Sequence, residues 1–280
     1  MRKKILVFFY CIYGIILLNA QQIVGKGSLF IIGGGDRPPA LVKQMLNAAH
    51  LKSSDHIAIL TMSSAEPDTS YAYIKADLVP QCKNTIAMLH FTKDNARDKV
   101  MLDSLRKAKL IFITGGIQSR FMNVVLHSPI YDAIHEAYRK GSMVAGTSAG
   151  AAVMSKEMIT GDQIRNDTMY SGAVDRIVKG NIQISEGLGL ITTAIIDQHF
   201  IVRGRYNRLL TALNQYPDKT CIGIDEETAI LVKGNKAVVI GSNQVIVLKS
   251  PTGIEIKPGN IIRMKEARIS ILTAGDSFTL

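Results

Sequence analysis

Short apolar runs alternate with amphipathic segments over the first three quarters of the chain. The amphipathic segments have apolar residues at helical spacing, and the runs of about five apolar residues are typical of buried strands. Strands are predicted at 28–32, 56–62, 85–91, 110–114, 143–147, 191–196 and 220–224, and helices at 40–51, 71–83, 98–108, 120–126 and 129–140. This alternation predicts an α/β fold with a doubly wound, mostly parallel sheet flanked by helices.

The pattern changes after the strand at 143–147. A helix is predicted at 151–158, followed by a glycine-rich and polar excursion at 160–187 and a helix at 200–215. Residues 236–248 are predicted to form a β-hairpin that turns at Gly241, Ser242 and Asn243. No internal repeat or linker divides the chain, so residues 21–280 are expected to form one domain.

The first twenty residues have the composition of a signal peptide. Three basic residues, Arg2, Lys3 and Lys4, precede the uncharged apolar run 5–18 and the small polar residues that follow it. This plan predicts cleavage after Ala20, export to the periplasm or the exterior, and no stable membrane insertion afterwards. A retained anchor is the alternative.

Net charge indicates the class of ligand, and cysteine content indicates whether a disulfide can form. The formal charge is +10, and loss of the three basic residues of the leader reduces it to +7. Because no lysine-arginine block is interleaved with aromatic residues, an acidic ligand is predicted, and nucleic acid is not. One disulfide between Cys82 and Cys221 is possible, although the apolar run around Cys221 favours a buried thiol.

Residues 143–152 carry the first candidate chemistry. The strand leads into Gly146-Thr147-Ser148-Ala149-Gly150, which has the Gly-x-Ser-x-Gly form of a nucleophile elbow. Such an elbow exposes the serine oxygen at a helix N-terminus, where backbone N–H groups stabilise developing negative charge. A closely packed strand-to-helix connection without chemistry is the alternative for this pattern.

A serine nucleophile needs a base and an acid that orients the base. Among the six histidines, His199 alone follows a predicted central strand at its carboxyl end, the same edge as Ser148. The next strand ends on Asp225, Glu226 and Glu227, and one of these is expected to reach His199.

Two backbone N–H groups are expected to form an oxyanion hole. Ala149 supplies one, and the Gly115-Gly116 turn at a neighbouring strand end supplies the other. No metal-ligand spacing is present, so neither a metal nor another cofactor is predicted. The glycines 33–35 follow a strand but do not continue as a dinucleotide-binding fingerprint, because Pro38 and Pro39 follow.

Three motifs, in this order, resemble those of the cyanophycinase family. They are Gly146-Thr147-Ser148-Ala149-Gly150-Ala151, Asp197-Gln198-His199-Phe200 with Arg203, Arg205, Arg208 and Leu209, and Gly223-Ile224-Asp225-Glu226. That family belongs with the aspartyl dipeptidases, which are serine peptidases on a class I glutamine-amidotransferase-like fold. The resemblance runs from about residue 27 to the end, and it implies a homodimer.

The resemblance implies roles for particular residues. Ser148 matches the nucleophile, His199 the base and Glu226 the acid. The positions that match the family's substrate pocket are Gln118, Asp197, Gln198, Arg203, Arg205 and Arg208. Ile117 departs from the family pattern, in which a polar residue precedes the glutamine. The implied substrate is cyanophycin or another aspartyl or β-aspartyl peptide, with the arginines holding its acidic groups and Asp197 its cationic side chain.

Two other functions remain open from the sequence. An α/β-hydrolase esterase would use Ser148 and His199 with an acid between them in the chain, such as Asp175. A secreted binding protein would keep the fold without turnover.

Overall fold

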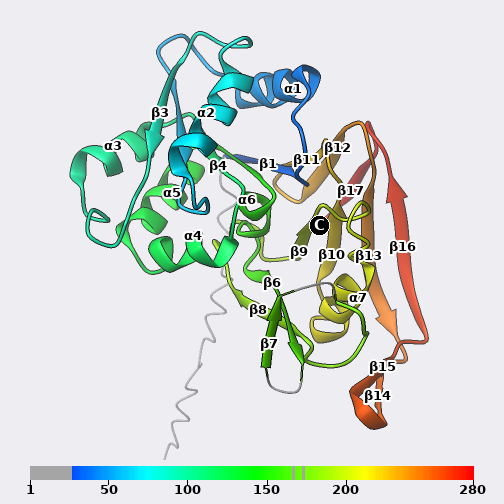
Figure 1. Ribbon diagram of the computed structural model, residues 1–280. Coiled ribbons are helices and arrows are strands. Elements are labelled where there is room, and N and C mark those ends of the chain that lie inside the picture. Colours follow the sequence, from blue (N-terminus) through cyan, green and yellow to red (C-terminus); the bar gives the residue numbers. More distant parts are fainter. Residues whose placement is uncertain (1–26, 166–167, 172–173) are drawn as a thin grey trace, which may run out of the picture.

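The computed structural model describes residues 27–165, 168–171 and 174–280, and its largest element is an eight-stranded sheet (Figure 1). The predicted leader, residues 1–20, lies outside the described residues. Five strands of this central sheet are parallel. In their order across the sheet they are β1 (Ser28–Ile32), β5 (Met143–Thr147), β4 (Leu110–Ile113), β2 (His56–Leu60) and β3 (Thr85–Leu89).

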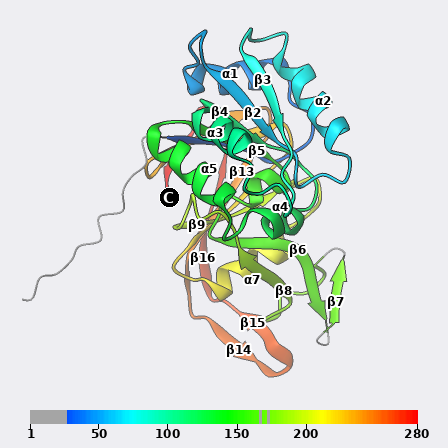
Figure 2. The same cartoon turned by 90° about the vertical axis from the view of Figure 1, so that its left-hand side faces the viewer.

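Helices cover both faces of the parallel strands, as the alternation predicted (Figure 2). On one face lie α1 (Pro39–Ala49) and α2 (Pro67–Leu78), and on the other lie α3 (Lys99–Lys107), α4 (Gln118–Val125) and α5 (Pro129–Lys140). The bounds of α5 follow local signals, because the Ser128 hydroxyl caps its first turn and Gly141 ends it in a left-handed conformation. The doubly wound α/β fold is confirmed.

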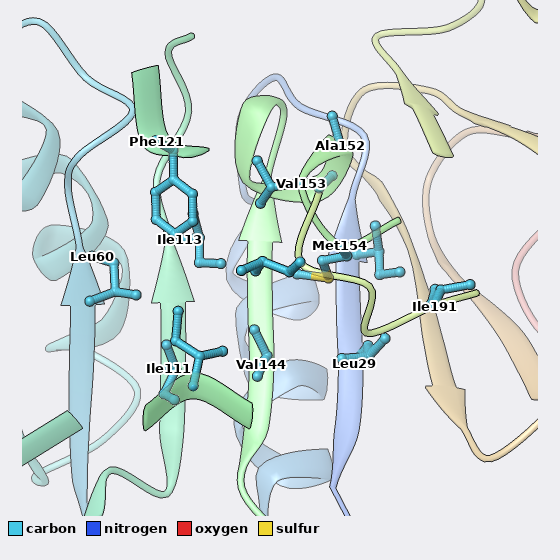
Figure 3. Close-up of a cluster of buried hydrophobic side chains, with 14 of the residues drawn as sticks. Leu29, Leu60, Ile111, Ile113, Phe121, Val144, Ala152, Val153, Met154 and Ile191 are labelled. Atoms are coloured by element: carbon cyan, nitrogen blue, oxygen red, sulfur yellow. The ribbon is translucent and has the colours of Figure 1, made fainter. Parts of the chain in front are cut away.

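Alternate residues of the parallel strands point to opposite faces and build two hydrophobic layers. Figure 3 shows one layer, in which side chains from four strands face the residues that follow the elbow. The strand residues labelled there are Leu29, Leu60, Ile111, Ile113 and Val144, and they lie near Phe121, Ala152, Val153, Met154 and Ile191. Each fully buried valine, leucine, isoleucine, phenylalanine or methionine side chain stabilises the fold by about 1.5–3 kcal/mol relative to an exposed one. This packing fixes the end of β5, which carries Ser148.

Antiparallel strands extend the central sheet, and a second sheet lies beside them. The extension is formed by β11 (Thr228–Lys233), β12 (Lys236–Gly241) and β17 (Ser277–Thr279). The second sheet has the order β16 (Glu266–Leu272), β13 (Val245–Thr252), β10 (Thr220–Ile224) and β9 (Ala194–Gln198). One face of it packs on β11 and β12, and α7 (Tyr206–Gln215) covers the other. The strand before His199 therefore lies in the second sheet, although the sequence pattern predicted a strand of the central one.

The predicted hairpin at 236–248 is wrong. Residues 241–243 do turn, but β12 pairs with β11 and β17, whereas β13 pairs with β10 and β16. Both edges of each strand are occupied by these other partners, so β12 and β13 do not pair with each other. Hairpins do form nearby, between β11 and β12 and between β14 (Glu255–Lys257) and β15 (Ile261–Arg263), the latter joined by the 3₁₀ turn η1 (Pro258–Asn260).

The predicted helix at 151–158 is also wrong beyond its first turn. The helix α6 spans only Ala149–Ala152, and β6 (Glu157–Arg165) begins five residues later. Backbone pairing overrides the local pattern here, because Ser155 bridges to Ile191 and Met158 pairs with β8 (Ile182–Glu186). With β7 (Thr168–Ser171), these strands make the excursion a small three-stranded sheet. Within the described ranges, every helix is too short or too polar to cross a bilayer.

Candidate active site

Ser148 lies at a sharp turn between β5 and α6. Its backbone has a positive φ of 55° with ψ −113°, a strained conformation typical of a nucleophile elbow. A Cβ at Gly146 would lie 2.3 Å from the Gly150 carbonyl oxygen, and one at Gly150 would lie 2.2 Å from the Ile113 carbonyl oxygen. The two glycines are therefore needed because the chain passes close to itself on both sides of the serine.

The second sheet brings an imidazole and a carboxylate to this serine. His199 follows β9, and its Nε2 lies 2.9 Å from the Ser148 Oγ. Its Nδ1 lies 2.5 Å from Oε1 of Glu226, which follows β10. In the tautomer with the proton on Nδ1, His199 donates to Glu226 and accepts the serine proton. These three residues, expected from the sequence to meet, lie within hydrogen-bonding distance.

The surroundings of His199 keep its imidazole neutral. Burial lowers the pKa of His199 below its ordinary value, and the hydrogen bond with Glu226 acts in the opposite direction. The positive charges of Arg203 and Arg205 lower the pKa of His199 further. A neutral imidazole at neutral pH is the form that accepts a proton.

The other candidate acids have different contacts. Asp225 accepts hydrogen bonds from the backbone N–H groups of Ile201 and Val202, 3.0 and 3.1 Å away. Asp175, the acid of the esterase alternative, accepts a hydrogen bond from the Gln163 side chain. Because Nδ1 of His199 faces Glu226, this geometry does not support the esterase arrangement.

A cavity of about 360 Å³ opens beside Ser148. It is lined by residues of four separate segments: Gly116, Gln118, Ser148, Thr160, Gly161, Val174, Gln198, Arg203, Gly204, Arg205 and Arg208. Three of the lining side chains are guanidinium groups, and among the lining residues that the structure describes none is acidic. Such a lining favours a ligand that carries carboxylates.

Asp197 does not line the cavity, contrary to the role expected for it. Its carboxylate is buried and accepts two hydrogen bonds from Arg208, one of them 2.6 Å long at Nε. Arg205 lies 3.8 Å away from the same carboxylate, and it also donates to the Gln198 side chain. Asp197 thus orients the arginines and is not available to bind a cationic side chain of a substrate.

Arg205 is the half-buried member of the arginine set. Burial and the charge of Arg208 lower the pKa of Arg205 to about 10, so it keeps its charge at neutral pH. The segment that carries Arg203 and Arg205 was predicted as part of a helix, but α7 begins only at Tyr206. The preceding residues form a turn, and the Asp225 carboxylate accepts hydrogen bonds from two of its N–H groups, those of Ile201 and Val202.

Some of the remaining predicted site residues line the cavity, and others do not. Gln118 lines the cavity and donates from Nε2 to the Ile159 carbonyl oxygen, whereas its neighbour Ile117 is 47% exposed at the start of α4. Ala149 follows the serine, and Gly116 lines the cavity. Gly115 lies close to Ser148, because a Cβ there would be 3.5 Å from the serine Cβ. It is not among the residues that line the cavity.

Several residues near the site were not assigned to it from the sequence. Thr160, Gly161 and Val174 of the excursion line the cavity, and only the glycine-rich composition of 160–187 indicated this placement. The glycines 33–35 contact His199 and Glu226 closely, although their sequence offered only the signal of a tight approach. Cys82 and Cys221 are both free, so the possible disulfide is not formed, and burial raises the pKa of Cys221.

Comparison with known proteins identifies relatives. A family model described as Peptidase family S51 matches residues 29–240, a range that includes Ser148, His199 and Glu226. A cyanophycinase of Trichormus variabilis is 40% identical over 126 residues, which are 45% of this chain and 39% of the relative. A cyanophycinase of Synechococcus elongatus is 30% identical over 183 residues, which are 64% of this chain and 53% of the relative. The matched regions thus span about half or less of these relatives.

Solved structures share the fold. A peptidase from an acI-B1 Actinobacterium superposes with a TM-score of 0.68 at 22% identity, covering 91% of this chain and 97% of that one. A putative peptidase E protein from Listeria monocytogenes EGD-e gives a TM-score of 0.54 at 15% identity, covering 78% of this chain and 99% of that one.

Proposed function

The chain belongs to peptidase family S51, and we propose that it is a serine exopeptidase that hydrolyses aspartyl or β-aspartyl peptides, including cyanophycin-like polymers. The observation that carries this proposal is the hydrogen-bonded series Ser148–His199–Glu226 at the edge of a cavity with three arginines. The similarity to cyanophycinases supports the same substrate class.

The proposed reaction proceeds through an acyl-enzyme. His199 takes the proton as the Ser148 oxygen attacks the carbonyl carbon of the substrate, and Glu226 stabilises the imidazolium that forms. The N–H groups of Ala149 and Gly116 stabilise the oxyanion. His199 then protonates the leaving amine, and water activated by His199 hydrolyses the ester.

The arginines explain selectivity for an acidic substrate. Arg203 and Arg205 present guanidinium donors to the cavity, and paired donors of this kind match the two oxygens of a carboxylate. The Arg208 guanidinium is held in one orientation by its hydrogen bonds to Asp197, and it contributes positive potential to the cavity. A cavity of about 360 Å³ accommodates a short peptide end, which favours exopeptidase action.

The test is hydrolysis of cyanophycin beside matched α- and β-aspartyl peptides, with products identified by mass spectrometry. Ser148→Ala is expected to abolish turnover while the melting temperature stays near that of the wild type. Glu226→Gln is expected to reduce kcat strongly, which an esterase using another acid would not show. Persisting hydrolysis in Ser148→Ala would exclude this mechanism.

A further inference from the structure

Three consecutive carbonyl groups at the end of β1 accept hydrogen bonds from the three segments of the site. The Ile32 oxygen accepts the N–H of Ser148 at 3.1 Å, and the Gly33 oxygen accepts the N–H of His199 at 2.6 Å. The Gly34 oxygen accepts the N–H of Glu227, next to Glu226, at 2.9 Å. One stretch of backbone therefore contacts β5, β9 and β10 where each strand ends.

The glycines 33–35, here called the Gly33–Gly35 turn, leave no room for side chains. A Cβ at Gly34 would lie 2.2–2.7 Å from three atoms of the His199 ring. One at Gly35 would lie 2.7 Å from the Glu226 Cβ, and one at Gly33 would lie 2.1 Å from the Asp225 carbonyl oxygen. The turn thus packs its bare backbone against the imidazole and the carboxylate side chain.

The far end of the turn is anchored to a helix. Arg37 donates from Nη1 to the Gly35 oxygen at 3.2 Å and from Nε to Asp77 of α2 at 2.6 Å. The near end is held by the N–H of Gly33, which donates to the Thr228 oxygen at 2.8 Å. With both ends fixed, the turn presents its carbonyl groups in one arrangement.

We propose that the Gly33–Gly35 turn is a positioning element that sets the distance between His199 and Ser148, with Gly34 as the surface on which the imidazole rests. This inference rests on the proposed function, because it gives the turn a role in the same triad. Residues 225–227 join β10 of the second sheet to β11 of the central sheet, whereas β9 has no such direct connection to β5. The shared backbone contact of the turn therefore fixes where β9 ends relative to β5. Gly34 and Gly35 transfer no proton themselves and act through His199 and Glu226.

The test compares Gly34→Ala and Gly35→Ala with Gly275→Ala. Gly275 also has a left-handed backbone, with φ 94° against 121° at Gly34, but a Cβ there meets no atom within 4 Å. It therefore reports the cost of the conformation alone. In Gly34→Ala, kcat is expected to fall by about 100-fold, the factor that a displacement of about 1 Å can cause, with KM nearly unchanged. Gly35→Ala is expected to lose less, because the Glu226 side chain is 31% exposed and can shift.

A readout without turnover completes the test. The proton shared by His199 Nδ1 and Glu226 is followed by its downfield NMR signal, which is expected to shift or disappear in Gly34→Ala and to persist in Gly275→Ala. Wild-type kcat and an unchanged signal in Gly34→Ala would overturn the inference, as would equal losses in Gly275→Ala. If Gly34→Ala does not fold, Gly35→Ala decides by the same criteria. An inactive wild type that keeps the signal would refute the proposed function, and the NMR comparison would still decide the role of the turn.

Discussion

Ser148 and His199 both have positive φ angles, 55° and 46°, which is costly for residues that carry a side chain. Conformations of this kind cost about 1–3 kcal/mol each, and they persist only where neighbouring structure holds them. Here the N–H groups of both residues are bound by carbonyl oxygens of Ile32 and Gly33. These strained conformations point the hydroxyl and the imidazole toward one another. Their alignment is therefore obtained at a cost in local stability.

The charge around His199 predicts the direction of a change in pH profile. Arg203→Gln removes a positive charge that lowers the pKa of His199, so the pKa is expected to rise. Because His199 acts as a base only when neutral, the acidic limb of kcat/KM should move to higher pH. Glu226→Gln removes a hydrogen bond that raises the pKa, so its limb should move to lower pH at a reduced rate.

The measurement is kcat/KM against pH for an aspartyl peptide, since this ratio reports groups of the free enzyme. Lys43→Gln, an exposed change on α1, serves as the control and should leave the limb in place. A limb that moves to lower pH in Arg203→Gln would contradict this account of the imidazole.

The buried pair of Asp197 and Arg208 predicts a large loss of stability on removal of one partner. Asp197→Asn leaves the Arg208 guanidinium, whose side chain is 8% exposed, without its counter-charge. Breaking a buried pair in this way costs about 3–5 kcal/mol. Glu136→Gln breaks two solvent-accessible ion pairs, with Lys140 on α5 and with Arg106 on α3, and it is expected to cost about 1 kcal/mol or less.

Urea unfolding measures both changes. The double variant Asp197→Leu/Arg208→Met removes both charges, and it is expected to recover part of the loss because no isolated charge remains. If Asp197→Asn and Glu136→Gln lowered the free energy of unfolding equally, the buried pair would contribute no more to stability than the solvent-accessible ones.

At the scale of elements, the parallel strands and their helices were predictable because each carries its own apolar period. The meeting of Ser148, His199 and Glu226 was predictable too, since each of them follows a recognisable strand. The helix at 151–158 and the hairpin at 236–248 were not, because pairing with distant strands decided them. A short apolar run does not reveal its partner strand, so β9 was placed in the wrong sheet although its end was identified.

The bulge in β6 predicts a specificity element. Pairing with β8 shifts register between Ile159 and Gln163, and the residues between them include Thr160 and Gly161 at the cavity. Bulges beside active sites commonly redirect residues in this way. A Cβ at Gly161 would lie 3.5 Å from Gln118 Nε2 and 3.9 Å from Arg208 Nη1, so an alanine methyl would fit against the protein and fill the space for substrate.

Gly161→Ala is therefore expected to raise KM for an aspartyl peptide about tenfold, as overpacking by about 1.4 kcal/mol would. The kcat value and labelling of Ser148 by a small fluorophosphonate should change little. Gly180→Ala, at another left-handed glycine with no atom within 4 Å of its Cβ, controls for backbone strain. A loss of kcat without a rise in KM would instead assign Gly161 to the catalytic geometry.

Across the whole molecule, the site exists only where separate layers meet. The central sheet supplies Ser148, the second sheet supplies His199 and Glu226, and the excursion closes one side of the cavity. The sequence located these residues at strand ends but gave no distance between the sheets. That distance depends on packing of the second sheet against β11 and β12, which no local pattern encodes.

The charge of the molecule and its cavity predicts a salt-dependent reaction. A chain of formal charge +10 with three arginines at the cavity attracts acidic substrates over distances that salt shortens, from about 30 Å at 0.01 M ionic strength to about 8 Å at 0.15 M. The kcat/KM for an aspartyl peptide should therefore fall as sodium chloride is added, mainly through KM. The matched asparaginyl peptide, which lacks the side-chain carboxylate, is expected to be a poorer substrate with a weaker salt dependence. Equal salt dependence for the two peptides would mean that the arginines do not recognise that carboxylate.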